Sequence, residues 1–143
     1  MTGSGKGGTD PLDMTGQWNG TFAYPAGLGP ATPFLATIAD AGGGISGTVT
    51  EPEIVLRTGR TMEAVLAGHR SGRALDFTKQ YRGQAFGYDN PVDYVGQLAD
   101  DGLSATGVWS LLDMNGTWEM HRDALAESVK ERETEVELPE PVT

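Results

Sequence analysis

Four polar side chains on the inner face of predicted strands are the ones in this sequence that could do chemistry. They are Tyr24, Glu51, Lys79 and Tyr81, each near the end of its strand. Burying a carboxylate or an ammonium group without a partner is costly. A Glu–Lys pair at this depth therefore indicates either polar contacts for a ligand or a solvated ion pair at the rim, which would contribute little. The same face carries four large aromatic residues, Phe77, Tyr94, Trp109 and Trp118.

The elements that must position these residues are strands, because apolar and polar residues alternate along the chain with a period of two. In segment 103–122, Trp109 and Trp118 share one parity on either side of a tight turn at Asp113 and Met114. That pattern predicts a hairpin with both indoles on one face. We expect eight strands, at about 16–24, 33–40, 44–51, 62–70, 73–81 and 91–99, with two more within 103–122.

The connections between these strands sort by length. Tight turns rich in glycine and aspartate lie at 40–43, 71–72 and 100–102. Long loops lie at 25–32, 52–61 and 82–90. Successive connections of an antiparallel meander alternate between its two ends, so all the tight turns share one end and all the long loops share the other. The sequence therefore predicts an all-β fold, an eight-stranded antiparallel up-and-down β-barrel with its mouth at the loop-rich end.

Glycines occupy several inward positions of the predicted strands, namely Gly20, Gly47, Gly68, Gly96 and Gly107. Because glycine gives up packing area inside a strand, they indicate either room for large aromatic side chains or an open lumen. An eight-stranded barrel is just wide enough to be filled by its own side chains or to hold one small ligand. Trp109 and Trp118 are therefore either core residues or ligand walls. Trp18, at the tight-turn end, is expected to close the bottom of the barrel.

Length and charge limit the classes of function. The 143 residues, with a net charge of −10 and no cysteine, are expected to form a Gly-rich arm (1–13), one barrel domain (14–122) and an acidic tail (123–143) that could include a short helix. The negative charge argues against nucleic-acid binding, and no apolar run approaches the roughly 18 residues of a membrane span. The amino-terminal segment lacks the apolar core of a signal peptide. We expect a cytoplasmic protein, or a secreted one if a leader precedes this sequence.

Residues suited to catalysis or metal binding are few. His69 and His121 fall on the outward parity, and two histidines do not supply the three or four ligands that a metal site needs. The serines have no histidine on the same face, and no GxSxG motif occurs. Acid–base chemistry by Glu51 and Lys79 in an enclosed lumen is the remaining enzymatic alternative. We expect no catalytic residue, no metal and no cofactor.

Five short motifs give the chain a resemblance to a known family. They are GQWNG around Trp18, PFLATIADAGGGISGTVTE, FTKQYR, YVGQLADDG, and TGVWSLL around Trp109. Over about residues 14–122 their order and spacing are similar to those of the avidin and streptavidin family, within the calycin group of lipocalin-like barrels. The resemblance implies a barrel that binds a small molecule between aromatic walls, often as a tetramer, with Phe77 and Trp109 against the ligand.

The polar residues that hold biotin in that family do not match here. Val49 and Glu51 stand where a tyrosine and a serine are expected on the third strand, and NGTWEMHR has no matching aspartate. The tryptophan lent by a neighbouring subunit also has no counterpart. We therefore expect a ligand other than tightly bound biotin.

The function expected from the sequence is non-catalytic binding of a small molecule at the loop-rich mouth. The expected contacts are Tyr24, Glu51, Phe77, Lys79, Tyr81, Tyr94, Trp109 and Trp118. The alternative is an assembly or interaction barrel with a filled lumen, which oligomerises through outward apolar residues such as Val65, Val95 and Val108. An isomerase- or cyclase-type enzyme is a third interpretation. A homo-oligomer, dimer or tetramer, is the expected state.

Overall fold

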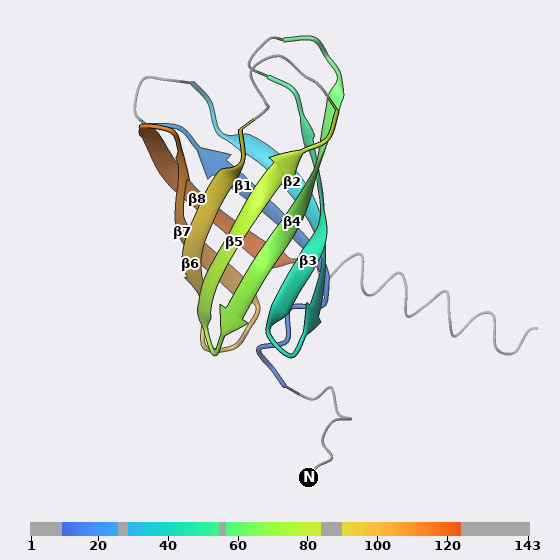
Figure 1. Ribbon diagram of the computed structural model, residues 1–143, viewed down its shortest axis with the longest axis vertical. Helices are drawn as coiled ribbons and strands as arrows, with labels where there is room; N and C mark the ends of the chain where they lie inside the picture. The colour runs from blue at the N-terminus through green and yellow to red at the C-terminus, as the bar shows by residue number, and fades with distance from the viewer. Residues whose placement is uncertain (1–9, 26–28, 55–56, 84–89, 124–143) are drawn as a thin grey trace, which may run out of the picture.

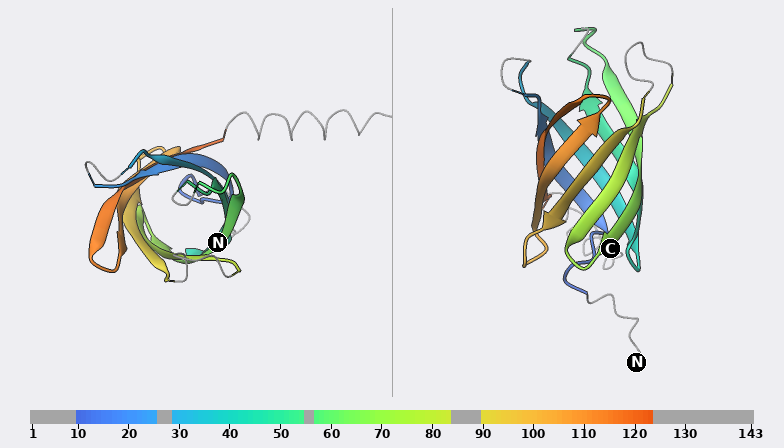
Figure 2. Two further views of the ribbon diagram at one scale, coloured as in Figure 1. Left: turned by 90° about the horizontal axis from the view of Figure 1, so that it is seen from above. Right: turned by 60° about the vertical axis from the view of Figure 1, so that its left-hand side comes forward.

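The computed structural model describes residues 10–25, 29–54, 57–83 and 90–123. Within these ranges it contains eight strands and no helix (Figure 1). The strands are β1 (Gly16–Ala23), β2 (Thr32–Ala41), β3 (Gly44–Pro52), β4 (Thr61–Ser71), β5 (Ala74–Tyr81), β6 (Val92–Leu98), β7 (Ser104–Leu111) and β8 (Met114–Arg122). Each strand pairs with the next in antiparallel fashion, and β8 pairs back with β1 to close the barrel (Figure 2). The predicted fold class is confirmed, as is the order of the strands.

The connections lie at the two ends of the barrel in the way that their lengths predict. The tight turns β2–β3, β4–β5 and β6–β7 lie at the end where β1 begins, drawn at the bottom of Figure 1. The longer connections β1–β2, β3–β4 and β5–β6 lie at the other end, together with the short β7–β8 turn. Parts of these loops fall outside the described residues, and so do most of the predicted Gly-rich arm and all of the predicted acidic tail beyond Asp123.

Glycines on the inner face make room for the two inward tryptophans. A Cβ atom on Gly107 would lie 2.7 Å from Nε1 of Trp118, and one on Gly116 would lie 2.7 Å from Cε2 of Trp109. Gly96 stands opposite Gly107 across the β6–β7 ladder and faces the same Trp118 ring. Of the two interpretations of these glycines, the structure therefore supports space for aromatic side chains.

Stacked and edge-on aromatic rings fill the lumen. Phe77 and Tyr94 stack with their centroids 5.5 Å apart, and the Trp118 ring lies 5.7 Å from the former and 5.8 Å from the latter. Phe22 meets Trp109 edge-on at 6.3 Å. Each such pair contributes about 0.5–1.5 kcal/mol beyond the burial of its area. Both indole N–H groups are satisfied, since Trp118 donates to the carbonyl of Val95 and Trp109 donates to the carbonyl of Ala23.

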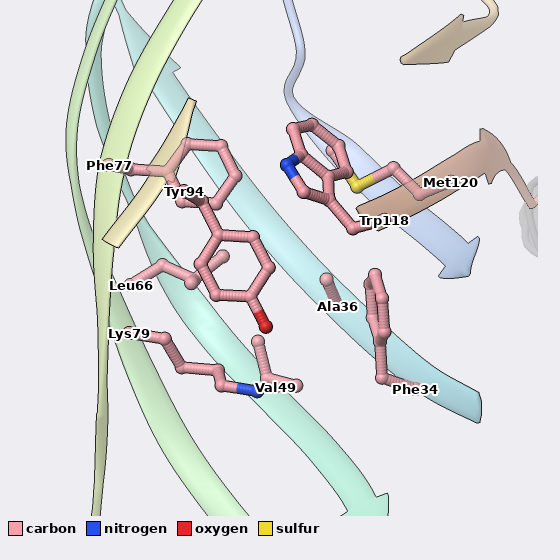
Figure 3. A pocket seen from close by; sticks show the side chains of 9 residues that line it. All are labelled: Phe34, Ala36, Val49, Leu66, Phe77, Lys79, Tyr94, Trp118 and Met120. Atoms are coloured by element: carbon pink, nitrogen blue, oxygen red, sulfur yellow. The ribbon is translucent and has the colours of Figure 1, made fainter. Parts of the chain in front are cut away.

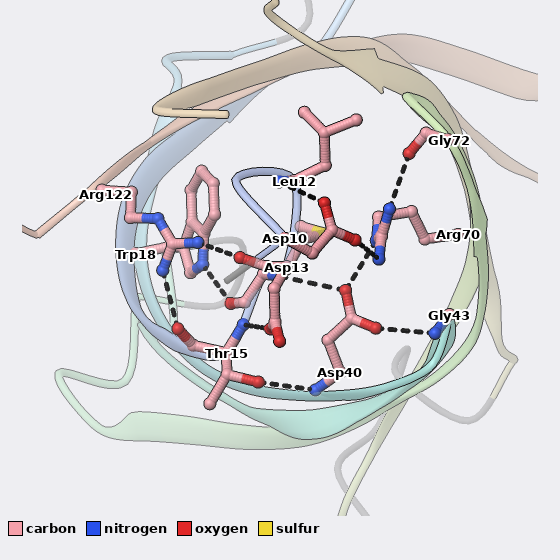
Figure 4. A network of polar contacts seen from close by, with 11 residues as sticks. Asp10, Leu12, Asp13, Thr15, Trp18, Asp40, Gly43, Arg70, Gly72 and Arg122 are labelled. Carbon is pink, nitrogen blue, oxygen red and sulfur yellow. Dashed lines mark hydrogen bonds and ion pairs between the residues drawn. The ribbon is translucent and has the colours of Figure 1, made fainter. Parts of the chain in front are cut away.

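Trp18 lies at the tight-turn end, as predicted, and segment 10–15 crosses this end of the barrel (Figure 4). Trp18 is completely buried, and its Nε1 donates to the carbonyl of Met14 at 2.9 Å. The guanidinium group of Arg122 lies 4.8 Å from the centre of the Trp18 ring and donates to the carbonyls of Thr15 and Asp13. The tight-turn end is therefore closed by the chain's own residues.

An ion pair ties the crossing segment to the wall. The buried carboxylate of Asp40 accepts hydrogen bonds from Nε of Arg70 at 2.6 Å, from the N–H of Met14 at 3.0 Å and from the N–H of Gly43 at 2.8 Å. Burial alone would raise the pKa of Asp40, but these hydrogen bonds and the Arg70 charge outweigh it and lower that pKa below its usual value. Asp40 is thus charged and fully bonded inside the closed end.

Candidate functional site

A second buried ion pair lies at the loop-bearing end of the lumen. Glu51 comes from the end of β3, and Lys79 comes from β5. Tyr81 follows Lys79 by two positions, so the two side chains share the inner face of β5. Strand β4 stands between β3 and β5 and pairs Met62 with Glu51. The register of these three strands therefore brings the three polar groups together across the lumen.

The three groups form one hydrogen-bonded cluster. Nζ of Lys79 donates to Oε1 of Glu51 at 2.9 Å, and the Tyr81 hydroxyl donates to Oε2 at 2.6 Å. The side chains of Glu51 and Lys79 are each only 3% exposed. The interpretation of this pair as a solvated ion pair at the rim is therefore wrong, because both side chains are buried. The carboxylate has a donor on each oxygen, which is what a buried charge requires.

Aromatic rings surround the ammonium group of Lys79. Its Nζ lies 4.3 Å from the centroid of Phe22, 4.8 Å from that of Tyr81 and 5.3 Å from that of Tyr94. Burial lowers the pKa of Lys79, although the charge and hydrogen bond of Glu51 act in the opposite direction. Burial and the Glu51 charge raise the pKa of Tyr81 and Tyr94 far above the usual value of 10.0. Both phenols therefore stay protonated at neutral pH.

Two further polar residues of this end were missed by the sequence reasoning. Thr32 is only 1% exposed, and its hydroxyl has no hydrogen-bond partner among the described residues. Burial raises the pKa of Tyr24, and the nearby charge of Glu51 acts in the same direction. Glu53 is buried and accepts hydrogen bonds from the N–H and the hydroxyl of Thr58. Glu53 follows Glu51 by two positions, and this spacing could have predicted that both side chains lie on the inner face.

A small cavity lies beside Lys79 (Figure 3). Its volume of about 10 Å³ gives room for roughly one water molecule. Figure 3 shows the Lys79 amine and the Tyr94 hydroxyl directed into this space. The lining residues are Phe34, Ala36, Val49, Leu66, Phe77, Lys79, Tyr94, Trp118 and Met120.

The eight predicted contact residues fall into two groups. Phe77, Lys79, Tyr94 and Trp118 line the cavity, and Glu51 and Tyr81 are bonded at its edge. Tyr24 and Trp109 belong instead to a neighbouring aromatic group, in which their ring centroids are 5.6 Å apart. Trp109 does not line the cavity. The site therefore centres on the ion pair and the Trp118 side of the lumen.

Clusters of metal-binding side chains and long apolar helices are both absent from the described residues. No three histidine, aspartate or glutamate side chains converge there in a way that could hold a metal ion, and His69 and His121 are exposed on the outer wall. None of the described segments forms a long apolar helix of the kind that spans a membrane. Comparison of the chain with models of known protein families, with curated protein sequences and with solved structures found no match.

Proposed function

We propose that this protein is a non-catalytic small-molecule-binding barrel of avidin-like, calycin type, with its ligand at the loop-bearing mouth. The observation that carries the proposal is the buried cluster of Glu51, Lys79 and Tyr81. Replacing a buried ion pair by apolar side chains of similar volume is often neutral or stabilising. A barrel that only had to be filled would have no need of these charges. Their place beneath the long loops, at the end opposite the closed one, supports a role in binding.

The size of the cavity limits how a ligand fits. About 10 Å³ beside Lys79 accepts one small polar group and not a whole ligand. The body of the ligand therefore lies above it, against Tyr24 and Tyr81 at the rim. The Glu51 and Lys79 charges cancel, and the Thr32 hydroxyl has no hydrogen-bond partner in the part of the chain that the structure describes. These features favour an uncharged ligand with a hydrogen-bonding oxygen.

Native mass spectrometry of protein isolated from its own source without denaturation tests this proposal. We expect a reproducible extra mass that denaturation releases. As a matched control, the double variant Lys79→Met/Glu51→Gln removes both charges together and should lose the extra mass while keeping the circular dichroism spectrum of the barrel. A wild-type protein that is bare, and that gains no mass when biotin or extracts of small molecules are added, would contradict the proposal.

A homo-oligomeric assembly barrel is the second candidate, and the filled lumen favours it. On the outer wall, Val95 of β6 and Val108 of β7 stand opposite one another and are 48% and 44% exposed. Such a pair could contribute to a subunit interface. If this candidate is correct, native mass spectrometry shows a bare dimer or tetramer, and Val108→Glu converts it to monomers. If the barrel is a binding protein, Val108→Glu leaves the extra mass in place.

A further inference from the structure

The amine of Lys79 combines the features that a lysine needs to react with carbonyl compounds. It is buried among aromatic rings, it is hydrogen-bonded to a carboxylate that can exchange protons with it, and it borders a cavity. We propose that Lys79 captures an aldehyde or ketone ligand as a Schiff base, with Glu51 as the proton relay and the counter-ion. This inference rests on the proposed function, because it names the ligand class of the same site.

Proton exchange within the pair prepares the nucleophile. Nζ of Lys79 and Oε1 of Glu51 are 2.9 Å apart, so one proton can pass directly from the ammonium group to the carboxylate. The transfer leaves an uncharged amine beside an uncharged carboxyl group. Burial excludes water from the ammonium group and lowers the pKa of Lys79, which favours the uncharged, nucleophilic amine.

The groups present at the site account for every proton that imine formation moves. The amine nitrogen bonds to the carbonyl carbon, and the carbonyl oxygen takes a proton by way of Glu51. The resulting hydroxyl group then leaves as water after taking a second proton through the same carboxyl group, and the nitrogen lone pair forms the C=N bond. In sum, an ammonium group and a carbonyl compound become a protonated imine and one water molecule. Glu51 ends as the carboxylate that it was at the start.

The product fits the site without rearrangement of charge. The protonated imine keeps one N–H, which occupies the place of the existing hydrogen bond to Glu51. Its positive charge remains over Phe22, Tyr81 and Tyr94, which already surround the ammonium group at 4.3–5.3 Å. The cavity of about 10 Å³ accepts the carbonyl oxygen or the departing water. The Tyr94 hydroxyl points into this space and can donate to that oxygen (Figure 3).

Reductive trapping with acetaldehyde tests the reactivity of Lys79 in the folded, full-length protein. The chain has three lysines, Lys6, Lys79 and Lys130, so peptide mapping by mass spectrometry follows each one separately. Sodium cyanoborohydride converts each imine to a stable N-ethyl group. At pH 7 we expect Lys79 to be ethylated on the order of tenfold faster than Lys6 or Lys130, since ordinary lysines are almost wholly protonated there. Ethylation of Lys79 no faster than that of the other two would overturn the inference.

The Glu51→Gln variant tests the relay. Its amide can still accept a hydrogen bond from Lys79 but cannot carry protons. Because the change also removes a charge that raises the pKa of Lys79, the two proteins are compared at alkaline pH, on the plateau where the Lys79 amine is uncharged in both. There the ethylation of Lys79 should be severalfold slower in Glu51→Gln, with Lys6 and Lys130 unchanged. Lowering the pH from 8 to 6 should slow Lys6 and Lys130 about tenfold per unit and Lys79 less steeply. The titratable groups facing Lys79 are Glu51, Tyr81 and Tyr94. Equal slopes for all three lysines would contradict the relay.

Borohydride reduction of protein isolated from its own source distinguishes this inference from the proposed function. One half of the sample is reduced with sodium borohydride before denaturation and the other half is left unreduced. An extra mass that survives denaturation only in the reduced half, on the Lys79 peptide, supports both proposals. An extra mass that is present in the native protein and lost from both halves keeps the binding function and overturns the Schiff base.

Discussion

Breaking the Glu51–Lys79 pair should destabilise the barrel strongly, whereas removing both charges should not. Lys79→Met keeps the unbranched chain up to the ε position but leaves the Glu51 carboxylate buried, with the Tyr81 hydroxyl as its remaining partner. Removing one member of a buried pair typically costs about 3–5 kcal/mol, because the other charge stays desolvated and unpaired. The double variant Lys79→Met/Glu51→Gln leaves no charge behind. We expect its free energy of unfolding to lie within about 1 kcal/mol of wild type.

Urea denaturation at pH 7, followed by tryptophan fluorescence, measures these free energies, and a constant m-value checks that the denatured state is unchanged. The exposed pair of Arg82 and Glu63, 3.8 Å apart, is the matched control within the same barrel. Glu63→Gln should change stability by less than about 1 kcal/mol. If Lys79→Met costs no more than Glu63→Gln, or if the two single changes at the buried pair simply add in the double variant, the pair is not the desolvated unit argued above.

Four further changes probe the rest of the barrel. The pKa of Asp40 is lower in the folded protein than its usual value. The stability that this carboxylate contributes is therefore present above its usual pKa and is lost as the pH falls through the lowered pKa. Asp40→Asn should thus flatten the acid limb of a stability–pH curve. The raised pKa of Tyr81 means that stability falls as pH rises above 10, and Tyr81→Phe should reduce that fall in thermal melts between pH 9 and 11. Gly107→Ala should cost several kcal/mol in urea titrations, because its Cβ would press on the neighbouring indole and strand, whereas Gly44→Ala meets only one atom at 3.5 Å and serves as the control. Trp109→Ala should cost about 3–5 kcal/mol and so lower the melting temperature steeply. A small loss there would show that this indole is not part of the core.

The fold could be predicted from the sequence because its two signals are local. Period-two alternation gave six strands with ends within one residue of those observed, and the sorting of loop lengths gave the meander and its two unlike ends. Both depend on neighbours along the chain. Trp18 was placed at the closed end by the same count of strands and turns.

The contents of the lumen could not be predicted in the same way, because they depend on cross-strand register. Parity places Gly107 and Trp118 on the inner face, but only the pairing of β7 with β8 sets them opposite one another. The Asp40–Arg70 ion pair joins residues 30 positions apart. In the sequence, Asp40 had the appearance of an ordinary turn residue. The burial of Glu51 likewise comes with its contacts to Lys79 and Tyr81 on β5, which the alternation along β3 does not report.

The Asp40–Arg70 and Glu51–Lys79 ion pairs have different structural roles, and the difference supports the proposed binding site at the loop-bearing end. Asp40 bonds to the N–H of Met14 as well as to Arg70, so it fixes a crossing segment that no strand ladder holds. Glu51 and Lys79, by contrast, link β3 to β5, and both strands are already fixed by continuous ladders to β4. The second pair therefore adds little to the topology, yet it carries the full desolvation cost of two charges. A desolvation cost without a structural return at this end of the lumen supports the proposed role of Glu51 and Lys79 in binding.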